Sequence, residues 1–248
     1  MTEQEQLIAD FMQHIRIVPA SENALILYID RSLTESLADQ LKIIATEIRL
    51  LVESKPFEII SSYASLLIHY DPLDTDHFLV KSIVNQAIKS MLLNSQLTDQ
   101  ARDNNEQEQL VELPVYYSAQ TGPDIERIAK HHNIEPEDVV RIHQQQTYRV
   151  FAIGFAPGFG YLGQVDTQIA MPRLSTPRSM VPKGAVAIAD RQTAVYPAAS
   201  PGGWNIIGQC PVLMFNPNNS PSMPFKVGDS VRFKAIDKSR FLAMGGEL

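Results

Sequence analysis

Three cations lie close together in a segment of the chain that is punctuated by prolines. The segment MPRLSTPRSMVPKG places Arg173, Arg178 and Lys183 within eleven residues, with no acidic residue among them. Prolines at positions 172, 177 and 182 keep the segment extended, because proline fixes φ and cannot continue a helix. Guanidinium and ammonium groups can bind a carboxylate or a phosphate. The segment therefore predicts an anion site with these three residues in catalytic roles, and a solvated surface strip is the alternative.

A glycine-rich stretch, GFAPGFGYLG at residues 154–163, precedes the cations and holds four glycines, one proline and three aromatic residues. We expect a stiff loop, neither helix nor strand, whose bare amides and flat rings contact a ligand. The candidate contacts are Phe155, Pro157, Gly158, Phe159 and Tyr161. The alternative is a barrel turn whose glycines adopt positive φ angles and whose rings fill a core.

Nucleotide-binding motifs do not explain this loop. Gly158, Gly160 and Gly163 match G-x-G-x-x-G after a β-type run, but QVDTQIAMPRLSTP follows where a dinucleotide site requires a helix. No Gly-Lys-Ser/Thr follows either, which excludes a P-loop. The glycine-rich stretch therefore matches neither of these two phosphate-binding motifs.

Further polar and aromatic residues follow in RQTAVYPAASPGGWNIIG. The candidate ligand contacts there are Gln192, Thr193, Tyr196, Ser200, Gly202, Gly203 and Trp204. Ser200 lacks the surroundings of a nucleophile elbow and is interpreted as a turn residue. His143 is the candidate base, with a structural histidine as the alternative. No histidine pair shows metal spacing, so no metal site is expected.

The first hundred residues contain a faint repeat at an offset of 41 residues. ALILYIDRSLTESLADQL, from Ala24, aligns with SLLIHYDPLDTDHFLVKS, from Ser65, and each has an apolar strand, an Asp and a Thr that can cap a helix. Buried helical stripes are predicted at Leu37, Leu41, Ile44, Ile48 and Leu51, and at Leu79, Ile83, Ala87 and Met91. With a strand at 57–62, the pattern predicts an α+β layer in which two helices cover one face of an antiparallel sheet.

The rest of the chain has a different pattern of predicted elements. Two short helices are predicted at 123–132 and 136–145, and from Tyr148 short β-type runs alternate with Pro- and Gly-rich turns, which indicates a β-barrel or sandwich. We expect an α+β domain at 1–95, a linker at 96–110 and a β domain at 111–248 that begins with the two helices.

Charge and composition exclude several classes. Residues 1–110 carry 8 Lys and Arg against 17 Asp and Glu, whereas residues 111–248 carry 13 against 11. No basic stripe suits nucleic acid, and no apolar run is long enough to span a bilayer. The single cysteine, Cys210, cannot form an internal disulfide. We expect a cytoplasmic protein that binds neither nucleic acid nor membrane.

The three motifs GFAPGFGYLG, PRLSTPRSMVPKGAVAIADRQTAVYPAASPGGWNIIG and FKVGDSVRF, in that order, resemble the PxpB family, the B subunits of prokaryotic 5-oxoprolinase, which includes the sporulation-kinase inhibitor KipI. The same domain occurs as allophanate hydrolase subunit 1 in biotin-dependent systems. The sequence departs from the family pattern at Asp190 and Ala194, where glycines are usual, and at Gln209-Cys210, where Arg-Thr is usual.

The resemblance implies a ferredoxin-like N-terminal domain and a cyclophilin-like barrel. It also implies ATP-dependent opening of 5-oxo-L-proline to L-glutamate together with 5-oxoprolinase subunits A and C, the latter supplying a second barrel paired with this one. The chain alone would be inactive, and ATP would bind to the complex. Two alternatives stay open: a KipI-like inhibitor of a sensor histidine kinase, and the carboxyltransferase half of a biotin-dependent urea carboxylase or allophanate hydrolase system.

Overall fold

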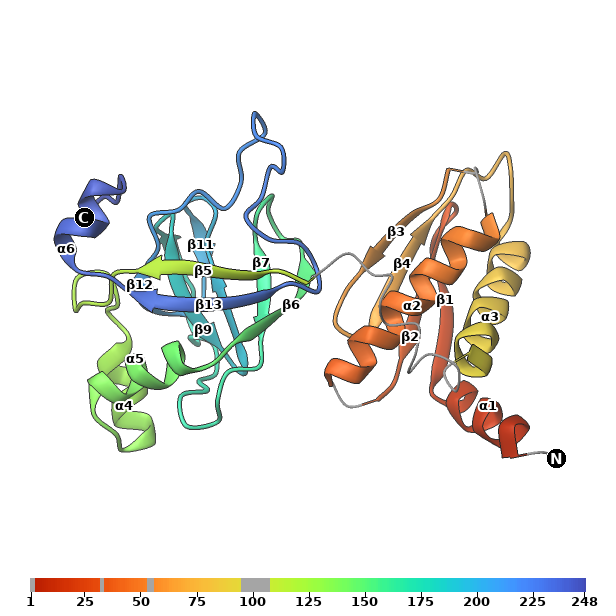
Figure 1. Cartoon of the computed structure of the whole chain (residues 1–248), viewed down its shortest axis with the longest axis horizontal. Helices are drawn as coiled ribbons and strands as arrows, with labels where there is room; N and C mark the ends of the chain where they lie inside the picture. The colour runs from red at the N-terminus through yellow and green to blue at the C-terminus, as the bar shows by residue number, and fades with distance from the viewer. Residues whose placement is uncertain (1–2, 32–33, 53–55, 95–107) are drawn as a thin grey trace. The chain divides into compact units, whose positions relative to one another are not determined.

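Two units of different architecture follow one another along the chain (Figure 1). The computed structural model describes residues 3–31, 34–52, 56–94 and 108–248. The contacts divide the chain into Met1–Gln107 and Glu108–Leu248. Residues 96–107 of the predicted linker lie outside the described residues, and the first strand of the second unit begins at Leu110.

The first unit is an antiparallel sheet with two long helices on one face. Its elements are α1 (Glu3–Gln13), β1 (Ile15–Ser21), β2 (Ala24–Ile29), α2 (Glu35–Val52), β3 (Glu58–Ser61), β4 (Ser65–His69) and α3 (His77–Asn94). The strand order is β1-β2-β4-β3, and α2 and α3 pack side by side over the sheet (Figure 1). The predicted α+β layer is thus present, while α1 and β1 have no counterpart among the predicted elements.

The predicted stripe of α3 is confirmed at Ala87 and Met91, which are buried, and Ile83 packs against the same core. Leu79 is exposed, and Val80, Val84 and Ile88 face the core instead. At the start of the helix, the side chain of Asp76, not that of Thr75, accepts the hydrogen bond from Leu79 N (2.8 Å). The threonine cap expected from the faint repeat is therefore wrong for the second helix.

The α2 helix follows its prediction closely. Thr34 Oγ1 accepts a hydrogen bond from Leu37 N (3.1 Å), as expected of a threonine N-cap. Leu37, Leu41, Ile44 and Ile48 are all buried in the core of this unit, and Leu51 is partly buried.

The second unit is a nearly closed barrel. Its elements are β5 (Leu110–Val115), α4 (Ile125–His132), α5 (Pro136–Gln145), β6 (Tyr148–Ile153), β7 (Gly160–Gly163), β8 (Arg178–Val181), β9 (Ala185–Ala189), β10 (Gln192–Val195), β11 (Ser200–Gly202), β12 (Asn205–Gln209), β13 (Ser230–Ala235) and α6 (Lys238–Ala243). The main sheet has the order β12-β9-β10-β7-β6-β13-β5, and β8 pairs with β11 separately. Tyr116 and Gln209 exchange two backbone hydrogen bonds (2.8 and 3.0 Å), which bring the end of β5 to β12.

The glycine-rich stretch is only partly a loop, which corrects the sequence expectation. Residues 160–163 form the strand β7, which lies between β6 and β10. These flanking strands supply the ladder hydrogen bonds, which an isolated glycine-rich segment could not predict.

Candidate functional site

One face of β9 is lined by alanines, and the candidate site is built on this face. Successive residues of a strand point to opposite faces of a sheet. Val186 and Ile188 therefore enter the barrel core, whereas Ala185, Ala187 and Ala189 lie on the other face, in a separate buried cluster with aromatic residues. Small side chains on this face leave room for large rings above them.

Phe159 is the centre of the aromatic cluster that fills this room. Its ring lies 5.3 Å from Phe155, 4.8 Å from Tyr161, 5.3 Å from Tyr196 and 5.6 Å from Trp204, all centroid distances in edge-to-face geometry. Such pairs stabilise beyond the area they bury, by about 0.5–1.5 kcal/mol each. The structure therefore brings three aromatic residues of the 154–163 stretch together with Tyr196 and Trp204.

Glycine is required beside the ring of Tyr196. A Cβ at Gly202 would overlap the Tyr196 hydroxyl. Gly202 thus permits a close approach of β11 to the cluster, and its role is one of packing.

Phe155 is presented to solvent at the edge of the cluster. Its side chain is 68% exposed and its φ is +70°, a backbone region that a bulky residue seldom adopts. The turn that holds it is fixed by a hydrogen bond from Phe159 N to Ala156 O (3.0 Å) and by Gly158, whose φ is +89°. Pro157 lies exposed within this turn. Phe155 is therefore exposed on a turn with an uncommon backbone conformation, and its predicted role as a ligand contact stays a prediction.

Arg173 lies over the Trp204 ring, with its Cζ atom 5.8 Å from the ring centroid. Burial raises the pKa of the Tyr196 phenol, while Arg173 and, more weakly, Arg178 act in the opposite direction. Both guanidinium groups therefore lie close enough to Tyr196 for their charges to be felt. Two of the three predicted cations thus border the aromatic cluster.

A buried carboxylate fixes Arg178. Its Nη2 donates to Asp124 Oδ1 (2.8 Å) and its Nη1 donates to the carbonyl of Trp204 (3.4 Å). Asp124 occupies the N-cap position of α4 but makes no capping hydrogen bond, because its other oxygen accepts from Ile206 N (2.7 Å). Arg178 is therefore held in place by an ion pair whose carboxylate is almost fully buried.

Asn205 anchors the start of the cationic segment. Its amide nitrogen donates to the carbonyls of Pro172 and Ile188 (both 3.0 Å), and its oxygen accepts from Arg127. A backbone hydrogen bond from Leu174 N to Gly203 O (2.7 Å) adds a second tie. Arg173 thus stands on a short segment that is fixed on both sides.

Three other predicted residues lie at the border of this region. By strand alternation Gln192 shares the face of Ala194 and Tyr196, and Ser200 pairs with Val181 between β11 and β8. Lys183 is exposed in the turn after β8, where its carbonyl accepts from Gln209 Nε2 (2.9 Å). The structure places them near the site's frame, and their predicted roles stay predictions.

Thr193 and His143 lie on the opposite face of the sheet. His143 is fully buried, with Nδ1 2.9 Å from Tyr117 Oη and Nε2 3.0 Å from Thr193 Oγ1. Burial lowers the pKa of His143 to about 3, so the imidazole is neutral at ordinary pH. The structure therefore separates these two predicted site residues from the aromatic cluster and joins them to each other.

Asp124 and Asn205 are two site residues that sequence reasoning missed. Asp124 follows Gly-Pro at a predicted helix start, which indicates an ordinary cap. Asn205 lies in the otherwise apolar run WNIIG. A buried amide in such a run must find hydrogen-bond partners, so this polar residue was the signal that could have identified Asn205.

Neither metal ligation nor a membrane span is supported by the described residues. In residues 3–31, 34–52, 56–94 and 108–248, no three His, Cys, Asp or Glu side chains come together as a metal site. In the same ranges, no helix has the length and apolar character to cross a membrane. Cys210 is buried, and burial raises the pKa of its thiol to about 12.

Comparison with known proteins gives a consistent set of relatives. The family model described as carboxyltransferase domain, subdomain C and D, matches residues 15–225. The chain is 37% identical over 198 residues to the 5-oxoprolinase B subunit of Bacillus subtilis (strain 168), covering 77% of this chain and 82% of that one. It is 32% identical over 220 residues to the 5-oxoprolinase B subunit of Haemophilus influenzae, covering 88% and 97%.

Two solved structures share the fold. TTHA0988 superposes with a TM-score of 0.70 at 27% identity over 87% of this chain, which spans 40% of the length of that structure. The urea carboxylase of Kluyveromyces lactis superposes with a TM-score of 0.71 over 92% of this chain and 22% of its own length, but at 14% identity this likeness shows the fold alone.

Proposed function

Because the chain belongs to the family of 5-oxoprolinase B subunits, within the carboxyltransferase domain C and D family, we propose that it works as the B subunit of an ATP-dependent 5-oxoprolinase. The reaction would open 5-oxo-L-proline to L-glutamate in a complex with the A and C subunits. The chain would contribute part of an active site and be inactive alone.

The observation that carries the proposal is the position of Arg173. Its guanidinium stacks on Trp204 beside Tyr196, and within the described parts of the chain it has no carboxylate partner. Arg178, in contrast, is already paired with Asp124. An exposed cation that lies over Trp204 and is not neutralised suits the carboxylate of the substrate or a phosphate.

The chemistry explains why such a cation is useful. A lactam is a poor electrophile, and transfer of the ATP γ-phosphoryl group to the amide oxygen would release ADP and activate the ring carbon for attack by water. The ring C–N bond would then break to give an acyl phosphate of glutamate, and a second water molecule would hydrolyse it to glutamate and phosphate. Negative charge develops on oxygen in both stages, and fixed cations stabilise it. In this proposal Arg173 contacts the developing negative charge directly, and Arg178 and Lys183 contribute positive charge nearby. Gln192 and the loop amides orient the substrate.

The remaining parts of the proposal concern the assembly. We assign ATP to the assembled complex, since the sequence contains no phosphate-binding motif of its own. We further propose that the first unit is ferredoxin-like, that the barrel is cyclophilin-like and pairs with a second barrel in the C subunit, and that the complex is cytoplasmic.

The test is glutamate release from 5-oxoproline and ATP by the A and C subunits, with and without this chain. We expect turnover only when all three are present. A complex that assembles fully but forms no glutamate would contradict the proposal.

A second candidate function is favoured by the exposure of Phe155. A ring held outward on a rigid turn suits docking to a protein, as in a KipI-like inhibitor of a sensor histidine kinase. Titration of such a kinase with this chain should then stop autophosphorylation, and Phe155→Ala should relieve the effect. Unchanged autophosphorylation at an excess of the chain would remove this candidate. The urea carboxylase alternative is supported by the fold alone.

A further inference from the structure

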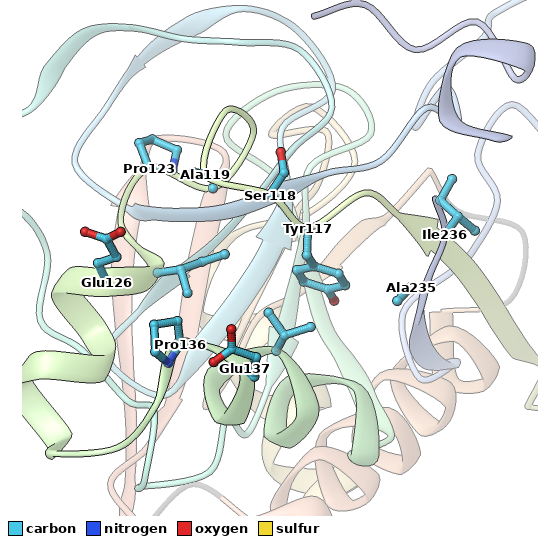
Figure 2. A pocket seen from close by; sticks show the side chains of 12 residues that line it. Tyr117, Ser118, Ala119, Pro123, Glu126, Pro136, Glu137, Ala235 and Ile236 are labelled. Carbon is cyan, nitrogen blue, oxygen red and sulfur yellow. The ribbon is translucent and has the colours of Figure 1, made fainter. Parts of the chain in front are cut away.

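A cavity lies in the barrel unit, and its lining shares no residue with the aromatic cluster. Figure 2 shows it between the loop after β5, the first turns of α4 and α5, and the end of β13. Its volume is about 650 Å³, within the range of pockets that hold small organic ligands. The lining residues are Tyr117, Ser118, Ala119, Gly122, Pro123, Ile125, Glu126, Pro136, Glu137, Val140, Ala235 and Ile236.

Hydrogen bonds connect the walls of this pocket to the rest of the barrel unit. In the loop, Thr121 Oγ1 donates to the carbonyl of Tyr116 (2.7 Å), and Thr121 N donates to Ser118 Oγ (3.2 Å). On the other side, Ala235 N donates to Gln144 Oε1 (2.7 Å). The hydroxyl of Tyr117 is held by His143. The cavity is thus formed before any ligand arrives, which lowers the entropy cost of binding.

The lining combines an apolar body with one sign of charge. Most of the surface is Pro, Ala, Ile, Val and the Tyr117 ring, while the two charged residues are Glu126 and Glu137. In Figure 2 the Glu137 carboxylate points into the space between Pro136 and Tyr117. Among the lining residues, all of which the structure describes, none is cationic, and neither carboxylate has an ion-pair partner in the described ranges.

The positions of Glu126 and Glu137 at helix starts explain only in part why acidic residues line the cavity. Both carboxylates lie in the first turn of a helix, where the macrodipole favours negative charge. Glu135 and Asp138 give α5 the same benefit without lining the cavity, and Asp138 pairs with Arg141 (2.6 Å). Glu137 is exposed to solvent and also lines the cavity, a placement that the helix start alone does not require.

We propose that this pocket binds an organic cation, an ammonium or guanidinium group carried on an apolar body. The head would pair with Glu137 and the body would lie against Ile125, Val140 and the Tyr117 ring. The chemistry is that of a free aralkyl amine and equally that of a lysine or arginine side chain with an apolar neighbour. The site is separate from the proposed oxoprolinase chemistry.

The test is an NMR titration of the isotope-labelled full chain with 4-phenylbutylamine. Two probes with the same body but no positive charge, 4-phenylbutanol and 4-phenylbutyrate, are the ligand controls. We expect amide shifts confined to residues 117–126, 136–140 and 235–236, with a Kd of about 1 mM. The amine should bind about five-fold more tightly than the alcohol, and the carboxylate should bind most weakly.

Matched variants separate the pocket from the general field of the helix. E137Q should weaken amine binding by about two- to five-fold, whereas E135Q, which removes the same charge from the same helix terminus outside the cavity, should leave it unchanged. Equal binding of amine and alcohol, an equal effect of E135Q, or no shifts at about 20 mM amine would overturn the proposal. These outcomes do not depend on 5-oxoprolinase activity.

A further titration, with a peptide, distinguishes between the two sources of the cation. Acetyl-Phe-Lys-amide carries the same head and a similar ring on a peptide backbone. Binding at least as tight as that of the amine, and sensitive to E137Q, supports a side chain of a partner protein. Weaker binding than that of the amine supports a free amine.

Discussion

The two faces of β9 and β10 differ in how they use polar groups. Towards the barrel core, Val186, Ile188 and Val195 surround Thr193 and His143, whose polar atoms are satisfied within the unit. Towards the other face, alanines support a layer of rings bordered by arginines. One face is closed to solvent and the other is open at its edge.

This difference shows how one pair of strands serves both stability and function. A strand places alternate residues on opposite faces, so core and site can be specified independently. The two arginines at the site repeat the contrast on a smaller scale, since Arg178 is neutralised by Asp124 and Arg173 is not. Four predictions test it, from the largest expected effect to the smallest.

Asp124→Ala should cause the largest loss. It leaves the guanidinium of Arg178 without its partner and the N–H of Ile206 without an acceptor, so we expect the free energy of unfolding of the barrel unit to fall by about 3 kcal/mol. Urea unfolding followed by fluorescence of Trp204, the single tryptophan of the chain, measures this unit. Asp138→Ala breaks an exposed ion pair and should cost far less than Asp124→Ala. Equal losses would contradict the structural role of Asp124.

Arg173→Ala should lower activity without lowering stability. If its free charge meets the developing anion, kcat/KM of the assembled complex should fall by about 100-fold, while the unfolding midpoint changes little because Arg173 is exposed. Arg178→Ala should lower both, since Asp124 is then buried without its partner. Normal turnover of the Arg173 variant would remove this residue from the proposed site.

Ala187→Leu tests the need for small residues beneath the rings. Ala187 is fully buried under the aromatic cluster, so a larger side chain should destabilise the barrel by about 2 kcal/mol through overpacking. Ala198→Leu, at an exposed position, should change stability by less than about 0.5 kcal/mol. A neutral Ala187 variant would show that the alanine face is not tightly packed.

The free energy of unfolding should depend on pH through His143, on the barrel-core face of the sheet. His143 has a folded-state pKa of about 3, below its ordinary value of 6.5, so only the unfolded chain binds its proton between these values. Stability is therefore fully present above pH 6.5 and falls as the pH drops, by about 1 kcal/mol per pH unit. Urea unfolding from pH 7 to pH 5, followed by Trp204, should show this slope. His143→Gln should reduce it, and an unchanged slope would assign the effect to other groups.

Sequence patterns predicted the elements that rest on local physics. The stripe of Leu37, Leu41 and Ile44, the helices at 123–132 and 136–145, and the β-rich second half all appear near their expected places. In the second stripe Ala87 and Met91 are buried as expected, whereas Leu79 is exposed and Asp76 caps the helix in place of Thr75. The strand at 160–163 was missed because its pairing partners, not its glycines, make it a strand.

By itself the sequence determined that prolines hold Arg173 and Arg178 on an extended segment, and that glycines and aromatic residues lie close before it, because spacing and φ restrictions are local. Only the tertiary structure decided which of these cations is neutralised and which predicted site residues share a face. Asp124 lies 54 residues from Arg178, and Thr193 is turned to His143 while its neighbour Gln192 is turned to the rings. Such pairings depend on strand register and on the burial of polar groups, which arise only when distant segments pack together.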